Sequence, residues 1–233
     1  MEVVSIFKSI NGEVCQWGQG SWAVFVRFFG CSAHCLYCDT PYSWQEGLRV
    51  EDLSVQSIVN KIKMFNIKRV VLTGGEPLEQ PIDQLILLIH QLQGLGYEIS
   101  IETNGLQDMD NIMMHTSGLS LVADLKLPSA GKHVRSKVNL DRYSVLGPTD
   151  FIKCVISSTQ DFKIALDSVA EINRKKLNIS KALPKIYFSP NTDSMPPFTL
   201  FSLMMHHAPS FIGFNFQIHK IIFGSDWRKE EKE

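Results

Sequence analysis

The chain has 233 residues, of which 44% are hydrophobic and 20% charged, enough to bury one full core. Its 23 lysines and arginines nearly balance its 24 acidic residues, so no basic field exists for a nucleic-acid backbone and nucleic acid is not an expected partner. Its apolar runs are far shorter than the roughly 20 residues of a membrane span, and the start MEVVSIFKSI lacks the features of a signal peptide. A cytoplasmic protein without membrane association is expected.

Strands and helices are predicted to alternate along most of the chain. Apolar, β-branched or aromatic runs indicate strands, and stretches with helical spacing between many of them indicate helices. The predicted strands are 22–29, 69–72, 98–102, 120–124, 151–157, 185–188 and 213–218, and the predicted helices are 54–65, 82–92, 161–175 and 198–207. Residues 131–149 predict a long loop with a short helix.

This order predicts an α/β fold, an incomplete parallel (βα) barrel of about six units. The chain is short for a complete barrel of eight units, which takes roughly 250 residues. A single domain is expected over residues 1–226, followed by a charged tail, 227–233, with the composition of a disordered segment.

Three cysteines lie in one short loop directly after the first predicted strand. Cys31, Cys35 and Cys38 form a CxxxCxxC pattern, and three soft thiolates from one loop can hold three irons of a [4Fe-4S] cluster. The fourth iron then stays open to another molecule. A structural zinc site that adds His34 or a distant residue is the alternative. Cys154, inside the apolar run FIKCVI, is predicted to be buried and without a role.

Polar segments follow the predicted strands at the point where each strand ends. They are the cysteine loop, then TGGEP, ETNG, DLK, SPN and QIHK, which begin at residues 73, 102, 124, 189 and 217. In a parallel barrel the loops at the carboxyl ends of the strands share one rim, and that rim carries the chemistry. One site built from all six segments is therefore expected.

The cysteine loop, with Tyr37 before its last cysteine, and the later segment Thr73-Gly-Gly-Glu-Pro77 together resemble the radical S-adenosylmethionine superfamily. The resemblance implies that Cys31, Cys35 and Cys38 hold a [4Fe-4S] cluster. It also implies that the open iron chelates the methionine part of S-adenosylmethionine, and that the chain is an enzyme.

The segments Ser9-Ile-Asn-Gly-Glu13, Phe25-Val-Arg27 and Cys38-Asp-Thr40-Pro-Tyr42 resemble the 7-carboxy-7-deazaguanine synthase family. The resemblance implies a lyase that converts 6-carboxy-5,6,7,8-tetrahydropterin to 7-carboxy-7-deazaguanine with loss of ammonia, a step toward deazapurine nucleosides such as queuosine. In that family a 5'-deoxyadenosyl radical removes hydrogen from C6 of the pterin, and Mg²⁺ is a further cofactor. A flavodoxin-like electron donor is implied, and a homodimer is the default expectation.

The family's site residues carry over by position. The resemblance places Tyr37, Asp39, Gly75, Asp124, Lys126, Ser189, Pro190 and Asn191 at the S-adenosylmethionine site, and Ile10, Asn11, Gly12, Arg27 and Thr73 at the substrate. It makes Thr40 a magnesium ligand. Three further residues are added from their place near the rim: Asn104 on the cofactor side, and Glu13 and His219 on the substrate side.

Some residues of this set can instead have a purely structural role. Arg27 offers a planar fork for a substrate carboxylate, although an arginine can also form a surface salt bridge. Thr40 can cap a helix or form a turn before Pro41, and His219, predicted in an apolar strand, can be an ordinary core histidine. Val14 stands where the family usually has glycine, which leaves the fold of that loop open.

Two functional alternatives remain open at this point. Another radical S-adenosylmethionine enzyme, such as a glycyl-radical activase, shares the cysteine loop and the TGGEP segment but does not need Arg27 together with the segment at residues 10–13. A non-enzymatic zinc or iron–sulfur module needs only the cysteines.

Overall fold

A computed structural model describes residues 1–45, 47, 49–178 and 182–224 of the chain. The predicted tail at 227–233 lies outside the described residues. In the described ranges, no helix is both long enough and apolar enough to span a bilayer.

One curved sheet of nine strands, in the order β3-β1-β2-β4-β5-β6-β7-β8-β9, forms the centre of the molecule. From β2 to β9 all neighbouring strands are parallel, whereas β1 pairs antiparallel with both β2 and β3. The order does not close on itself, which confirms the predicted incomplete barrel. The strands are β1 (Glu2–Ile10), β2 (Trp22–Phe28), β3 (Glu51–Asp52), β4 (Arg69–Thr73), β5 (Glu98–Thr103), β6 (Leu119–Asp124), β7 (Phe151–Ile156), β8 (Lys185–Pro190) and β9 (Ile212–Phe214).

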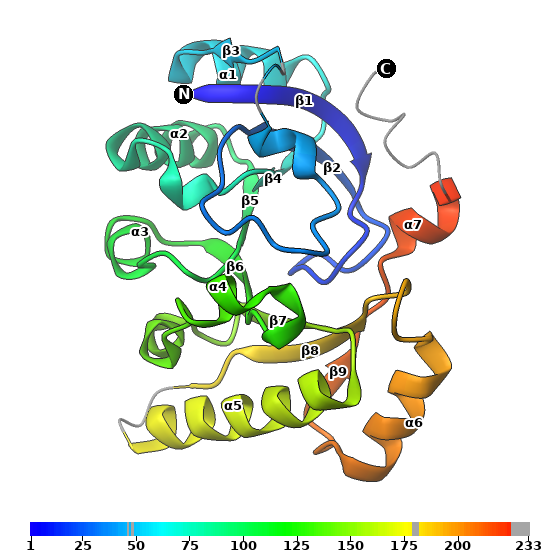
Figure 1. Ribbon diagram of the computed structural model, residues 1–233. Helices are drawn as coiled ribbons and strands as arrows, with labels where there is room; N and C mark the ends of the chain where they lie inside the picture. The colour runs from blue at the N-terminus through cyan, green and yellow to red at the C-terminus, as the bar shows by residue number, and fades with distance from the viewer. Residues whose placement is uncertain (46, 48, 179–181, 225–233) are drawn as a thin grey trace.

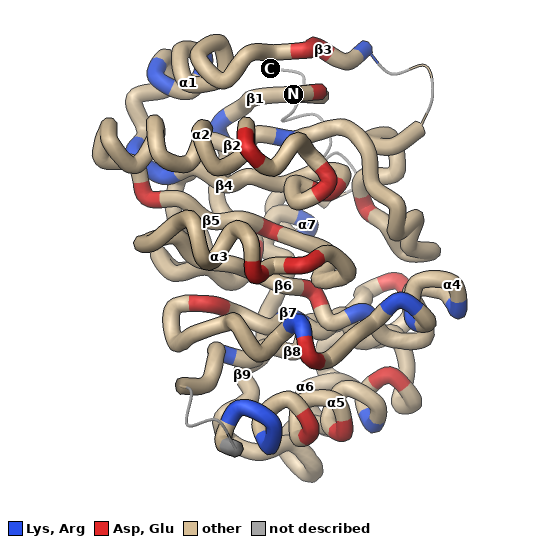
Figure 2. Tube along the Cα trace, turned by 90° about the vertical axis from the view of Figure 1, so that its left-hand side faces the viewer, with Lys and Arg blue, Asp and Glu red and all other residues tan. Residues whose placement is uncertain are grey.

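Most helices lie on the outer side of this sheet, and loops gather on its inner side together with the short helices at Lys132–Arg135 and Ile218–Phe223 (Figure 1). The helices are α1 (Val55–Lys63), α2 (Ile82–Gly94), α3 (Asp110–His115), α4 (Lys132–Arg135), α5 (Thr159–Asn178), α6 (Pro197–His207) and α7 (Ile218–Phe223). Short 3-10 turns lie at Pro41–Trp44, Pro77–Glu79, Pro128–Ala130 and Leu140–Val145. Along the side with the outer helices, acidic and basic residues are interspersed (Figure 2), so neither sign dominates.

Helix α1 shows how the sequence builds this outer layer. The Ser54 side chain accepts a hydrogen bond from the backbone N–H of Ser57 and so caps the first turn. The side chains of Val55, Ile58 and Ile62, spaced three and four residues apart, are buried against the sheet. The main core lies between these helices and the strands and includes Leu72 and Leu88, both fully buried.

Several elements differ from the sequence prediction, among them the short β3 and α3, which were not predicted. Strand β1 was not predicted, because its burial alternates weakly and it carries Lys8 and two serines. The predicted strand 213–218 ends at Phe214, and residues from Ile218 onward form α7 instead. The placement of His219 in a strand was therefore wrong. The predicted loop with a short helix at 131–149 is confirmed by α4 and the 3-10 turn that follows it.

Candidate active site

The three cysteines of the motif face one pocket on the inner side of the sheet. They lie in the loop that leaves β2, and each is partly buried. Two backbone hydrogen bonds hold the ends of the loop: Gly30 N–H donates to the Ser43 carbonyl at 2.8 Å, and Leu36 N–H to the Ala130 carbonyl at 3.0 Å. Burial raises the pKa of the Cys31 and Cys35 thiols.

The cysteines suit a cluster better than a single ion. Across the described ranges, no three His, Cys, Asp or Glu side chains are grouped closely enough to bind one metal ion. Zinc needs four ligands gathered around one centre. In an iron–sulfur cluster each cysteine binds a different iron, so thiols that are separated but share a pocket can serve. The donor set therefore fits the cluster that the sequence predicts.

The glycine-rich segment after β4 lies directly against the end of β2, where the cysteine loop begins. Gly75 has a left-handed backbone, and a Cβ there would collide with the carbonyl oxygens of Phe28 and Gly30. Only glycine fits such a position. Glu76 N–H donates to the Gly30 carbonyl at 2.7 Å, and Gly75 N–H donates to the Ser43 hydroxyl at 3.0 Å. These contacts join the TGGEP segment to the base of the cysteine loop.

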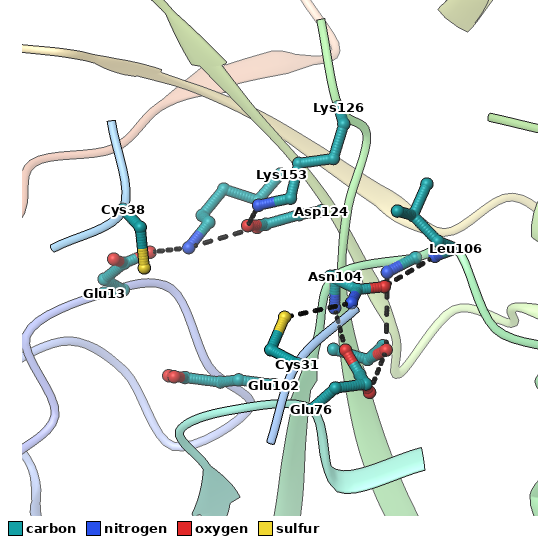
Figure 3. A network of polar contacts seen from close by, with 12 residues as sticks. Glu13, Cys31, Cys38, Glu76, Glu102, Asn104, Leu106, Asp124, Lys126 and Lys153 are labelled. Carbon is teal, nitrogen blue, oxygen red and sulfur yellow. Dashed lines mark hydrogen bonds and ion pairs between the residues drawn. The ribbon is translucent and has the colours of Figure 1, made fainter. Parts of the chain in front are cut away.

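A buried carboxyl, Glu76, supports the next segment of the rim. Glu76 is fully buried, and its carboxylate accepts from the Thr103 hydroxyl at 2.7 Å and from Asn104 N–H at 2.6 Å. Burial raises the pKa of Glu76 to about 7, against these hydrogen bonds. The Asn104 side chain in turn reaches Cys31 (Figure 3).

Alternating charges cross the pocket on its opposite side (Figure 3). Lys153 on β7 contacts the carboxylates of Glu13 and Asp124, the latter at 3.2 Å, and Lys126 contacts Asp124 at 2.6 Å. Burial disfavours the charged form of both lysines, but the neighbouring carboxylates outweigh it and raise their pKa values.

Two carboxyls of the pocket, Glu13 and Glu102, have pKa values shifted in opposite directions. Burial opposes the ionisation of Glu13, but the charges of Lys153 and His219 outweigh it, so its pKa lies below the ordinary value. Burial and the nearby charge of Glu13 raise the pKa of Glu102 to about 7. Glu102 accepts a hydrogen bond from the Thr73 hydroxyl at 2.8 Å. The pocket therefore contains one firmly ionised carboxylate and one carboxyl that titrates near neutral pH.

The loop after β1 forms the floor of the pocket. Because β1 runs antiparallel to β2, its last residue pairs with Trp22 at the amino end of β2. From there the loop crosses the pocket, where Gly12 C=O accepts from Ile218 N–H of α7 at 2.9 Å and Gly12 lies against the His219 ring. Val14 packs with buried residues of β6 and β7. An apolar side chain at this position thus seals the floor.

Arg27 lies in the wall that β2 contributes. Its side chain is buried, with the guanidinium carbon 5.7 Å from the Phe7 ring centre and 5.9 Å from that of Tyr42. A buried cation that lines a pocket attracts an anionic ligand group. Among the described residues, the buried Tyr37 hydroxyl and Trp44 indole N–H, also in the pocket lining, make no hydrogen bond within the protein. Both can therefore bind a polar ligand.

Most of the predicted site residues line this one pocket. They are Ile10, Gly12, Glu13, Arg27, Cys31, Cys35, Tyr37, Cys38, Asp39, Thr40, Thr73, Gly75, Asn104, Asp124, Lys126, Asn191 and His219. Asn11, Ser189 and Pro190 are not among its lining residues. Asn11 is buried behind the floor, where its side chain accepts from Glu13 N–H at 3.1 Å, and Ser189 accepts from the Asn215 side chain at 3.1 Å.

Sequence reasoning missed several pocket residues. Lys153 was not predicted, and Glu102 and Gln217 were given no individual role although their segments were expected in the site; Gln217 donates to Glu13 at 2.7 Å. The signal for Lys153 was a single lysine in the otherwise apolar run FIKCVI. The signal for Glu102 was its place at the start of ETNG, where β5 ends.

The chain is similar in sequence and in fold to known proteins. Residues 25–118 match the model of the radical SAM superfamily. A 7-carboxy-7-deazaguanine synthase of Clostridium acetobutylicum is 34% identical over 97% of this chain and 98% of the relative, and one of Methanospirillum hungatei is 37% identical over 71% and 65%. The crystal structure of QueE from Escherichia coli has the same fold, with a TM-score of 0.67, 19% identity and 92% of each chain covered. The chain belongs to the 7-carboxy-7-deazaguanine synthase family.

Proposed function

We propose that this chain is a radical S-adenosylmethionine lyase that converts 6-carboxy-5,6,7,8-tetrahydropterin to 7-carboxy-7-deazaguanine with release of ammonia. The observation that carries the proposal is the 34% identity to a 7-carboxy-7-deazaguanine synthase along nearly the whole of both chains. The pocket supports it, because the cysteine loop and the segment at residues 10–13 lie in the lining of the same cavity. The product belongs to deazapurine biosynthesis of the queuosine type.

The cysteine side of the pocket is proposed to hold the cofactors. Cys31, Cys35 and Cys38 would bind a [4Fe-4S] cluster, which would supply the electron for reductive cleavage of S-adenosylmethionine. Gly75 lines the pocket, and Asp124 and Lys126 present a pair of opposite charges there. Such a pair can orient a zwitterion such as the methionine moiety. Tyr37, Asp39, Asn104 and Asn191 complete this side, and Ser189 and Pro190 support it from behind.

The other side of the pocket is proposed to bind the pterin. The buried guanidinium of Arg27 can pair with the substrate carboxylate, while Glu13 can accept hydrogen bonds from ring N–H groups. Ile10, Gly12, Thr73 and His219 shape the remaining wall, with Asn11 holding the Glu13 turn. The Glu102 carboxyl titrates near pH 7, so it can exchange a proton with bound substrate while an amine departs as ammonia.

Further features of the proposal concern the setting of the reaction. Thr40 would provide a neutral oxygen to Mg²⁺, which commonly takes its other ligands from water and substrate. A flavodoxin-like carrier would supply the electron, and the enzyme would act as a homodimer. A cytoplasmic location is proposed because a cluster held by three free thiols requires a reducing compartment.

The test is an anaerobic product assay on reconstituted protein. Wild-type protein given the carboxytetrahydropterin, S-adenosylmethionine and a reductant should form 7-carboxy-7-deazaguanine, detected by mass spectrometry. Cys35→Ala should abolish both product formation and S-adenosylmethionine cleavage, whereas Cys154→Ala, a buried cysteine outside the pocket, should retain both. Cleavage of S-adenosylmethionine without the product would favour another radical enzyme. One bound zinc and no sulfide would favour the non-enzymatic module.

A further inference from the structure

The side-chain amide of Asn104 points at the sulfur of Cys31. The distance from Nδ2 to Sγ is 3.7 Å, and Figure 3 shows this contact inside the pocket. Asn104 is 8% exposed, so little water competes for its amide hydrogens. An amide N–H that faces a thiolate in such surroundings forms a charge-assisted hydrogen bond.

The orientation of this amide follows from its other contact. The side-chain oxygen of Asn104 accepts a hydrogen bond from Leu106 N–H at 2.8 Å. Because a backbone N–H can only donate, the oxygen must face Leu106, and the amide nitrogen is left to face Cys31. The side chain therefore cannot rotate to present its oxygen to the sulfur without losing the bond to Leu106.

Glu76 holds the backbone that carries Asn104. Its carboxylate accepts from Asn104 N–H at 2.6 Å, from the Thr103 hydroxyl at 2.7 Å and from Leu78 N–H at 3.0 Å. Glu76 is 0% exposed and comes from the TGGEP segment after β4. A chain of hydrogen bonds thus runs from Glu76 through Asn104 to the first cysteine of the motif.

We propose that Asn104 is a positioning residue that sets the reduction potential of the cluster by donating a hydrogen bond to Cys31, and that Glu76 fixes its placement. The inference rests on the proposed function, which puts the cluster on Cys31. Reduction adds negative charge to a cluster and its sulfur ligands, and a hydrogen-bond donor stabilises that added charge. The Asn104 amide therefore makes the cluster easier to reduce.

The first test compares reduction potentials of anaerobically reconstituted proteins, measured by EPR-monitored titration without S-adenosylmethionine. Asn104→Asp keeps the oxygen that accepts from Leu106 N–H but loses the donor, and Asn104→Ala removes the donor without adding charge. Both variants should have a lower potential than wild type, with the Asp variant lowest. Gln107→Ala removes an exposed side-chain amide from the same loop, outside the pocket lining, and should leave the potential unchanged.

An unchanged potential in a cluster-loaded Asn104→Ala protein would overturn the proposal. A second measurement uses only the wild type, so it does not depend on a variant that folds. Protein labelled with ¹⁵N in the asparagine side-chain amide should show a nitrogen coupled to the reduced cluster by pulsed EPR. Absence of that coupling also refutes the hydrogen bond. Failure of wild-type protein to assemble any [4Fe-4S] cluster would instead refute the proposed function, on iron and sulfide analysis.

Discussion

The pocket has two walls that are built by different chemistry. The amide wall consists of Glu76, Asn104 and Cys31 and is held by hydrogen bonds from neutral groups to one buried carboxyl. The charged wall consists of Glu13, Lys153, Asp124 and Lys126 and is held by ion pairs between β6, β7 and the loop after β1. Both walls are mostly buried, but only the second brings four formal charges together.

The difference shows which parts of the site are fixed by the fold. Buried charges that neutralise one another are locked in place, because moving one leaves its partner uncompensated. In the amide wall the sulfur of Cys31 receives its hydrogen bond from a neutral group, so the energy of that contact depends on the charge that the sulfur carries.

The largest loss of stability is expected from Lys153→Met. Removing this ammonium leaves Glu13 and Asp124 without their shared partner in a buried site, which costs about 3–5 kcal/mol of the free energy of unfolding. Urea unfolding measures the loss. Lys175→Met is the matched control, since its partners Asp141 and Glu171 are exposed and solvent screens the pair, so its loss should be much smaller than that of Lys153→Met. Equal losses in the two variants would contradict the distinction between buried and exposed pairs.

A smaller change in stability is expected from Glu102→Gln, and its size should depend on pH. The pKa of Glu102 rises from 4.5 to about 7 on folding, so between these values the native state binds more protons and stability falls as the pH rises. If the whole pKa shift were coupled to folding, wild type would lose about 3 kcal/mol of its free energy of unfolding over this pH range. Because the side chain is half-buried at the pocket wall, we expect a loss of about 2 kcal/mol.

The Gln variant still accepts from the Thr73 hydroxyl but cannot ionise. The stability of wild type relative to Glu102→Gln should therefore fall between pH 4.5 and 7.5 and stay constant above it. Thermal melts over this pH range measure the difference. A difference that does not change with pH would show that Glu102 ionises normally in the folded protein.

The smallest effect is expected from Glu79→Gln, on the outer surface of the amide wall. Glu79 is exposed and accepts hydrogen bonds from Ser32 N–H and from the Gln107 side chain. Because solvent can replace these contacts, we expect a loss of about 0.5–1 kcal/mol in chemical unfolding. A loss above about 2 kcal/mol would mean that the cysteine loop depends on its exposed anchor.

The parallel strands and the cysteine loop could be predicted from the sequence because their signals are local. Apolar runs mark β4 to β8, and the three cysteines lie within eight residues of each other. Lys153 could not be predicted as a site residue, since its partners Glu13 and Asp124 are 140 and 29 positions away and meet it only in the folded sheet. In the apolar run before His219, short-range pattern does not distinguish a strand from a helix.

The floor of the pocket has a consequence for the order in which the site is assembled during synthesis. The cysteines, the TGGEP segment and Asn104 all precede residue 105, whereas Gly12 meets its partners Ile218 and His219 only after residue 219 has been made. A growing polypeptide can therefore present its thiols for metal loading while the substrate chamber is still open underneath. Helix α7 then closes the chamber against Gly12, a residue that was made long before it.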